Sequence, residues 1–248
     1  MPGVFSKRPV LIGAAVAVLA VAVLAMAGLA VAAGGTALTP SASADVASLA
    51  SAGRGQAALE IITGTPVLDV SIAPLAGTLL RVSVPDNAPV TPVLSGSAPI
   101  VLSLTGRSVS ARPGAAYAVS VVLSSSVRWS LDFAGGTQQI RADLRGGQVG
   151  GIAVTAGTDI LQITLPRPAG TLPFLLAGGV TQFKLGLPGG VPARVTVGGG
   201  ASYVSVDDQD LTGVAGGTVL TPPGWAGAAS RFDIDATSGF SRLTVSRW

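Results

Sequence analysis

The chain has 248 residues, of which 48% are hydrophobic, only 4% aromatic and 11% charged, and it contains no cysteine and no histidine. These absences exclude disulfides, a zinc site of the usual Cys/His kind and a nucleophile activated by histidine. The net charge is +3, and once Lys7 and Arg8 are subtracted from the 15 basic residues, 13 remain against 12 acidic ones. The remaining arginines are spread singly, without the basic stripe that binds nucleic acid, so we expect no nucleic-acid partner.

Residues 1–35 combine a basic start with a long apolar run. The stretch from Val10 to Ala33 carries no charge and is long enough for a membrane-spanning helix. Small residues at Ala30–Ala32 and Ala42–Ala44 instead fit the cleavage site of a secretory signal peptide. Since the basic residues stay inside, we expect export in either case: the protein is anchored to the membrane with its C-terminal domain outside, or secreted after cleavage.

Residues 36–56 are rich in Ala, Ser and Gly and show little periodicity. This composition is typical of a flexible spacer. The folded domain is therefore predicted to cover residues 57–248.

The folded region repeats one pattern, in which a glycine is followed by a short alternating apolar run. After Gly157, for example, Leu161, Ile163 and Leu165 alternate with other residues, and such alternation predicts a half-buried β-strand. A second alternating run precedes most of these glycines, so each unit consists of two short strands. We assign a structural role to the glycines that open the units, which are Gly64, Gly96, Gly136, Gly157, Gly179, Gly200 and Gly239.

The units recur every 21 or 22 residues between Gly136 and Gly200, which predicts an array of stacked units. We expect an all-β β-solenoid or β-roll, in which each unit adds one rung to two facing sheets. In that fold Leu161, Phe183 and Val204 lie in one column. An antiparallel β-sandwich is the alternative, because strand signals spaced about 8–12 residues apart suit that fold too.

Residues 207–231 interrupt the repeat and are predicted to form a loop insertion. Asp207, Asp208 and Asp210 follow a strand directly, and carboxylates in such a cluster are candidates for binding Ca²⁺ through oxygen. A solvated turn explains the cluster as well. Trp225 is a candidate ligand platform, but we favour a structural role in which the loop folds over one end or flank of the stack and largely buries Trp225.

The glycine-led ladders, with Leu165-Pro166, Leu187-Pro188 and Gly190–Pro192, resemble the bacterial "putative adhesin" β-repeat proteins. The segments Gly213–Val219 and Pro222–Trp225 are similar to segments of exported actinobacterial β-repeat proteins of unknown function. The resemblance covers about Leu59 to Trp248 and implies a β-repeat architecture. It implies adhesion as a function and supplies no catalytic residues.

These observations predict a non-enzymatic cell-envelope protein that mediates adhesion by binding a protein or glycan partner, without a required cofactor. Two alternatives stay open. One is an enzyme that acts on glycans with paired carboxylates, using Asp207, Asp208 or Asp210 together with Asp233 or Asp235. The other is a purely structural spacer in the envelope.

Overall fold

The structure, a computed structural model, describes residues 41–43, 46–86, 88–107 and 117–248. These residues belong to the second of two units, Leu38–Trp248, while the first, Met1–Ala37, lies outside the described residues. The predicted apolar helix of residues 1–35 and the start of the predicted spacer therefore fall outside what the structure describes. Within the described ranges, no helix has the length and apolar character needed to span a bilayer.

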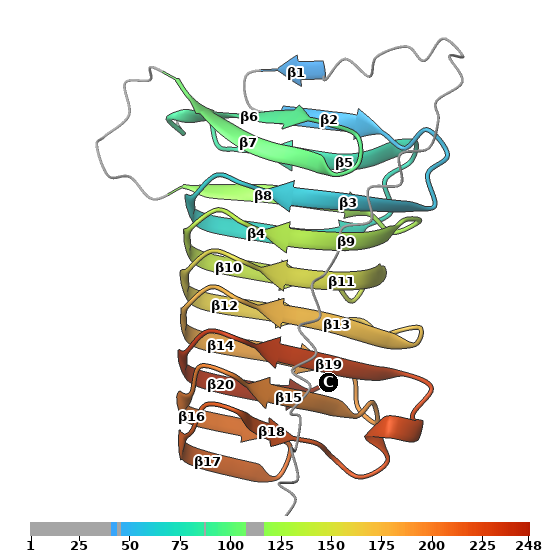
Figure 1. The fold of residues 1–248 in the computed structure, drawn as a ribbon. Helices are drawn as coiled ribbons and strands as arrows, with labels where there is room; N and C mark the ends of the chain where they lie inside the picture. Colours follow the sequence, from blue (N-terminus) through green and yellow to red (C-terminus); the bar gives the residue numbers. More distant parts are fainter. Residues whose placement is uncertain (1–40, 44–45, 87, 108–116) are drawn as a thin grey trace, which may run out of the picture. The chain divides into compact units, whose positions relative to one another are not determined.

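The described residues form two facing β-sheets, both mixed and largely parallel (Figure 1). Sheet A has 11 strands, in the spatial order β1 (Ser41–Ser43), β2 (Val46–Ala50), β5 (Thr78–Ser83), β8 (Ala118–Ser124), β4 (Thr65–Ala73), β10 (Thr137–Asp143), β12 (Thr158–Thr164), β14 (Val180–Leu187), β20 (Phe240–Arg247), β16 (Ala201–Val206) and β17 (Gln209–Val214). Sheet B has 9 strands, in the order β18 (Thr218–Leu220), β15 (Ala193–Val197), β19 (Arg231–Ala236), β13 (Thr171–Leu176), β11 (Gln148–Val154), β9 (Arg128–Phe133), β3 (Gln56–Ile61), β7 (Ile100–Gly106) and β6 (Val90–Ser95). A short 3₁₀ helix, η1 (Trp225–Gly227), lies between β18 and β19 in the sequence.

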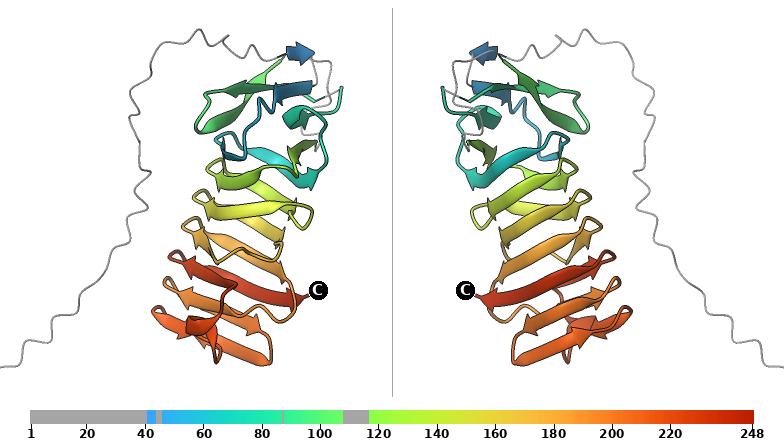
Figure 2. Two further views of the ribbon diagram at one scale, coloured as in Figure 1. Left: turned by 90° about the vertical axis from the view of Figure 1, so that its right-hand side faces the viewer. Right: turned by 90° about the vertical axis from the view of Figure 1, so that its left-hand side faces the viewer.

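A strand of sheet B, a corner and the next strand of sheet A together form one rung, and the rungs lie one above another (Figure 2). In the middle of the stack, β9–β10, β11–β12 and β13–β14 follow one another in chain order. Alternate residues of these strands point between the sheets, which is why the sequence shows a period of two. The pairings here are parallel, so the antiparallel sandwich does not describe them.

Leu161, Phe183 and Val204 lie in one column, as predicted, but Leu243 stands between the last two. Leu161 pairs with Phe183, and both Phe183 and Val204 pair with Leu243. The reason is the spatial order of the rungs: β19–β20 lies between β13–β14 and β15–β16, although it follows both in the sequence. The first rung, β3–β4, is likewise flanked by β7 and β8 on one side and by β9–β10 on the other.

The strands at both ends of the stack pair antiparallel, and here the structure departs from the predicted boundaries. Gly96 does not open a rung corner but lies in the turn between β6 and β7, which pair antiparallel, and has a φ of 69°. Residues 46–50 of the predicted spacer form β2, with Ala47 and Leu49 buried, because a short apolar alternation lies within the Ala- and Ser-rich composition. The predicted loop of residues 207–231 contains β17 and β18, which form the edges of the two sheets.

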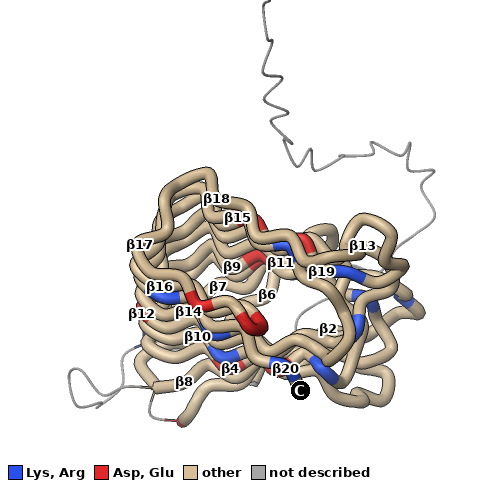
Figure 3. The backbone as a smooth tube through the Cα atoms, turned by 90° about the horizontal axis from the view of Figure 1, so that it is seen from below, with Lys and Arg blue, Asp and Glu red and all other residues tan. Residues whose placement is uncertain are grey.

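The core is the layer between the two sheets, and small aliphatic side chains fill most of it. The largest fully buried side chains include Trp129, whose Nε1 donates a hydrogen bond to the Ser124 carbonyl oxygen at 2.9 Å. Phe174 of sheet B and Phe183 of sheet A stack across the layer with their ring centroids 5.2 Å apart. Among the described residues the buried set contains no charged side chain, and Figure 3 shows the charged residues scattered over both sheets.

Candidate functional site

A groove runs along the corners at which successive rungs pass from sheet B to sheet A. Its volume is about 780 Å³, and it crosses five rungs of the stack. The glycines that line it come from equivalent positions in these rungs, and they are Gly64, Gly136, Gly157, Gly179 and Gly239. We call this feature the glycine groove.

Packing explains some of the corner glycines, including Gly64 at one end of the groove, where a Cβ atom would collide with the Gly136 carbonyl oxygen. It does not explain the three glycines in the middle of the groove, which we call its floor. At Gly135 a Cβ atom would lie 2.5 Å from the backbone of Thr63, and at Gly178 it would collide with the Ala156 carbonyl oxygen. At Gly157, in contrast, a Cβ atom would lie 3.6 Å from its nearest neighbour, which is an ordinary contact.

The two neighbouring floor positions behave in the same way as Gly157. A Cβ atom would lie 3.9 Å from its nearest neighbour at Gly136 and 4.0 Å at Gly179. None of these three glycines has a positive φ, and all three are exposed. Neither sterics nor backbone conformation therefore requires glycine there, and the effect of its presence is an open groove floor.

Two rows of side chains flank the floor. The inner row contains the buried Thr65, Thr137 and Thr158, whose hydroxyl groups donate to nearby backbone carbonyl oxygens at 3.2–3.3 Å. The outer row is exposed and polar, with an amide, a carboxylate and two hydroxyl groups in register on neighbouring strands, and it consists of Gln138, Asp159, Thr181 and Ser241. This row offers donors and acceptors to a ligand that lies along the groove.

The acidic cluster predicted from the sequence lies at the turn between β16 and β17. Asp207 has a φ of 52° and accepts two hydrogen bonds from Arg247, whose Nε and Nη2 lie 2.6 and 2.9 Å from Oδ1 and Oδ2. These hydrogen bonds hold the pKa of Asp207 below its ordinary value. Asp210 accepts a hydrogen bond from the Tyr203 hydroxyl at 2.8 Å, and hydrogen bonds from Ser205 and Tyr203 lower its pKa.

The structure does not gather these carboxylates into a metal site. Among the described residues there is no group of three His, Cys, Asp or Glu side chains placed to hold a metal ion. Asp207 and Asp208 line a small pocket together with Ala193, Leu220 and Pro222, whereas Asp210 is not among its lining residues. The calcium candidates Asp207, Asp208 and Asp210 are therefore adjacent in sequence without converging on one point.

The second acidic pair lies elsewhere, on the outer face of sheet B. Asp233 forms a two-pronged ion pair with Arg194, with nitrogen–oxygen distances of 2.9 and 2.7 Å. Asp235, two residues further along β19, is exposed, and its neighbours on the flanking strands are Leu175 and Thr196. The pocket lined by Asp207 and Asp208 is not lined by Asp233 or Asp235, so the predicted pairing of the two acidic groups is not found in this pocket.

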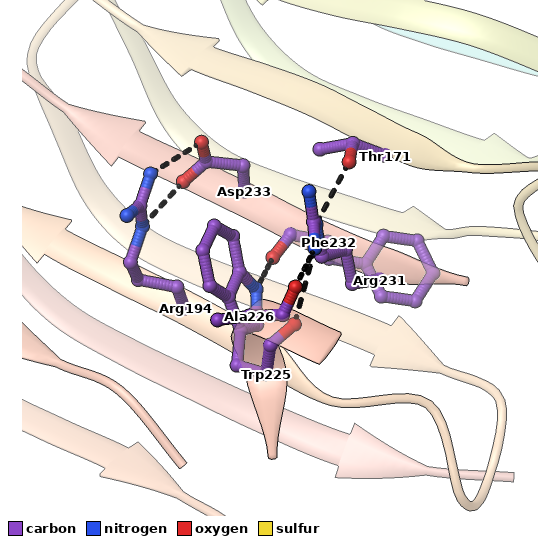
Figure 4. Close-up of polar contacts among 7 residues, drawn as sticks. All are labelled: Thr171, Arg194, Trp225, Ala226, Arg231, Phe232 and Asp233. Carbon is purple, nitrogen blue, oxygen red and sulfur yellow. Dashed lines mark hydrogen bonds and ion pairs between the residues drawn. The ribbon is translucent and has the colours of Figure 1, made fainter. Parts of the chain in front are cut away.

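Trp225 is held against the outer face of sheet B (Figure 4). Its Nε1 donates to the Phe232 carbonyl oxygen at 2.7 Å, and the guanidinium carbons of Arg194 and Arg231 lie 3.9 and 4.7 Å from its ring centroid. The predicted fold of the insertion over a flank of the stack is what the structure shows here. The indole is only partly buried, however, because two arginines cover it in place of apolar side chains.

Sequence reasoning missed the groove and the arginines that tie distant segments together. Arg194, Arg231 and Arg247 stand singly in alternating strands, where nothing local marks their partners. The outer row of the groove had a signal, since Gln138, Asp159 and Thr181 each stand two positions after a corner glycine. Finding it required the register that places those positions side by side.

The sequence matches no family model and no curated protein. A similar fold is found in the crystal structure of a "putative cell adhesion protein" from Clostridium sporogenes ATCC 15579. The TM-score is 0.56 at 10% sequence identity, and the similarity covers 82% of this chain and 98% of that chain. At this identity the likeness shows a shared all-β fold and nothing more.

Proposed function

We propose that this chain is an exported, non-enzymatic cell-envelope protein, a β-solenoid that holds an extended glycan chain in the glycine groove. The observation that carries the proposal is the groove floor, where Gly136, Gly157 and Gly179 leave space that an ordinary side chain would fill. The structural likeness to the "putative cell adhesion protein" is in keeping with this class of function. Export rests on the basic and apolar N-terminal residues.

The chemistry of the groove favours a glycan over a protein partner. Asp159 is the carboxylate among its lining residues, which include no basic side chain. Hydroxyl and amide groups in the outer row both donate and accept hydrogen bonds, as sugar hydroxyl groups do. A polypeptide that joins a sheet does so at a strand edge. The groove, in contrast, lies at a row of corners.

The arrangement also bears on the alternative of a carboxylate-dependent enzyme. Asp207 and Asp233 are each engaged by an arginine, which donates hydrogen bonds to both carboxylate oxygens. Asp207 lies in the turn that follows β16 of sheet A, whereas Asp233 lies on β19 of sheet B. Their placement favours a role in tying the fold together.

The test is a binding assay of the full chain with insoluble cell-wall glycans, compared with Gly157→Val and Thr181→Ala variants. A side chain on the floor and the loss of an outer-row hydroxyl should each weaken binding, by about tenfold or ~1.4 kcal/mol for Gly157→Val. The matched control is Gln162→Ala, because Gln162 is an exposed polar residue on β12 outside the groove lining.

Three results would contradict the proposal. Binding that is unchanged in both groove variants would place the partner elsewhere on the stack. Capture of a protein partner but no glycan would assign the groove to a different class of ligand. Turnover of a glycan that stops in Asp208→Asn would support the enzyme alternative.

Sequencing the N-terminus of the protein from the cell envelope separates an anchor from a cleaved signal.

A further inference from the structure

The rung β19–β20 fills a slot in the stack, and we call it the inserted rung. β19 pairs in parallel with β13 on one side and β15 on the other, so that Ile234 lies between Phe174 and Val195. β20 does the same in sheet A between β14 and β16, where Val245 lies between Leu185 and Val206. In Figure 1 the two red strands of this rung run between orange ones.

The slot is apolar and deep in the core. The apolar side chains that the inserted rung places in it are at most 7% exposed, and they are Phe232, Ile234, Ala236, Phe240, Leu243 and Val245. Without these residues, β13, β14, β15 and β16 would each present an unpaired edge beside exposed apolar surface. Strand edges of this kind are competent to pair with a strand supplied by another chain.

The segment that connects the inserted rung to the preceding strand divides into two parts. Trp225 belongs with the rung, because its Nε1 bonds to the Phe232 carbonyl oxygen and Arg231 donates to the Trp225 and Ala226 carbonyl oxygens. The preceding residues, 221–224, carry two prolines and a glycine with a φ of 75°. These residues lie outside both sheets, and Pro222 and Gly224 accept backbone hydrogen bonds from Trp225 and Gly227 of η1. Because proline cannot donate to a sheet ladder, we take residues 221–224 as the hinge between β18 and the rung.

We propose that copies of this chain link to one another by exchanging the inserted rung, so that residues 225–247 of one copy fill the slot of a second copy. The walls of the slot make the same contacts with a rung from either source, including the Arg194–Asp233 and Arg247–Asp207 ion pairs. Only the path of the hinge distinguishes the two arrangements. Exchange of an identical element requires few new contacts and is therefore a common route to dimers. By mass action, the fraction of exchanged dimer rises with protein concentration.

The chain has no native cysteine, so engineered thiols can report where the rung lies. Thr196 of β15 and Asp235 of β19 are outward-facing neighbours on adjacent strands, at a spacing that a disulfide can bridge. Two differently tagged full-length copies, one with Thr196→Cys and one with Asp235→Cys, are unfolded, mixed and refolded at high concentration. Disulfide-linked heterodimer is then measured by capture on both tags.

The matched control pair is Ala153→Cys with Leu175→Cys, which are neighbours on β11 and β13. These two rungs are consecutive in both sequence and space, so we do not expect them to exchange between copies. Because exchange holds the two thiols together, we expect at least about tenfold more heterodimer from the Thr196/Asp235 pair than from the control pair. A chain whose own rung is first locked by both cysteines, Thr196→Cys and Asp235→Cys, should not enter the dimer.

Equal yields from the two pairs would overturn the proposal, as would incorporation of the locked chain. Co-expression of the two tagged copies replaces refolding where the chain aggregates after denaturation, and the same comparison applies. Gly224→Val supplies an independent check. It disfavours the positive φ of the hinge and should increase the heterodimer yield without altering the slot.

Discussion

Arg247 and Asp207 form an ion pair that joins the end of the inserted rung to the β16–β17 turn, with nitrogen–oxygen distances of 2.6 and 2.9 Å. The remaining guanidinium nitrogen, Nη1, donates to the Val191 carbonyl oxygen at 2.8 Å. The side chains of Arg247 and Asp207 are 25% and 39% exposed, so solvent screens the pair in part. Together these contacts of Arg247 join three segments of the chain, those that contain Val191, Asp207 and Arg247 itself.

Replacing Asp207 by Asn removes the charge while keeping a residue that tolerates its positive φ. We expect the free energy of unfolding to fall by about 1 kcal/mol, after allowing for solvent screening. Urea denaturation measures it, with Asp208→Asn as the neighbouring control. Equal effects of the two substitutions would show that the ion pair contributes nothing specific.

The same pair makes stability depend on acid. Because the pKa of Asp207 is lowered in the folded state, its contribution is complete above the ordinary carboxyl value of about 3.9 and is lost as the pH falls through the lower folded value. The difference in urea midpoint between the parent chain and Asp207→Asn should therefore shrink as the pH is taken from neutral to strongly acidic. A difference that stays constant over that range would contradict the assignment.

Asp132 should show the opposite dependence. Burial raises the pKa of its carboxyl group, against the effect of the hydrogen bond from Thr155. The folded state then favours the protonated form, so the penalty for the charged form grows as the pH rises through the raised value. We expect Asp132→Asn to become more stable relative to the parent chain as the pH rises toward neutrality. Denaturation midpoints at acidic and neutral pH test the sign.

The corner glycines should respond to substitution in two different ways. Gly178→Ala places a Cβ atom against the Ala156 carbonyl oxygen and should cost about 2 kcal/mol. Gly157→Ala meets only an ordinary contact and should leave stability within ~0.5 kcal/mol, or raise it slightly by restricting the unfolded chain. Thermal denaturation of both variants separates the two positions. A large loss for Gly157→Ala would give that glycine a packing role.

Trp225→Ala should destabilise the chain by about 2 kcal/mol, less than the ~3–5 kcal/mol expected of a fully buried aromatic residue. The loss combines the hydrogen bond to Phe232 with the two guanidinium contacts on the ring. Trp225→Phe keeps an aromatic ring but loses the hydrogen-bond donor, so its stability should lie between those of the parent chain and Trp225→Ala. A change below ~0.5 kcal/mol for Trp225→Ala would mark a surface residue and favour the ligand-platform interpretation.

Local alternation predicted the strands and their stacking, because burial of one strand face shows in the sequence at every second residue. Leu161, Phe183 and Val204 were placed in one column on that basis. Alternation does not order the rungs, however. From the sequence pattern alone, either Leu243 or Val204 could be the neighbour of Phe183, because both are apolar. Only the pairing of whole strands places Leu243 between the other two.

The candidate site was harder to predict than the fold. The sequence identifies the floor glycines as members of a repeat and predicts a structural role for them. Their spacing does not reveal whether a side chain would collide with the next rung. This collision is what distinguishes Gly178 from Gly157. Contacts such as that of Arg194 with Asp233 join residues 39 positions apart, so no local sequence motif predicts them.

The position of the inserted rung also constrains the order of events as the chain folds. A chain that emerges from a ribosome or an export pore in sequence order presents β15 and β16 before β19 and β20. The slot between β14 and β16 then stays open until residues 231–247 have emerged, and these late contacts have a large sequence separation, which slows folding. During that interval the unpaired edges of β14 and β16 are prone to aggregation. A translation pause just before residue 231 is therefore expected to make this chain depend on a holding chaperone more than a pause in the middle of the β9–β14 stack.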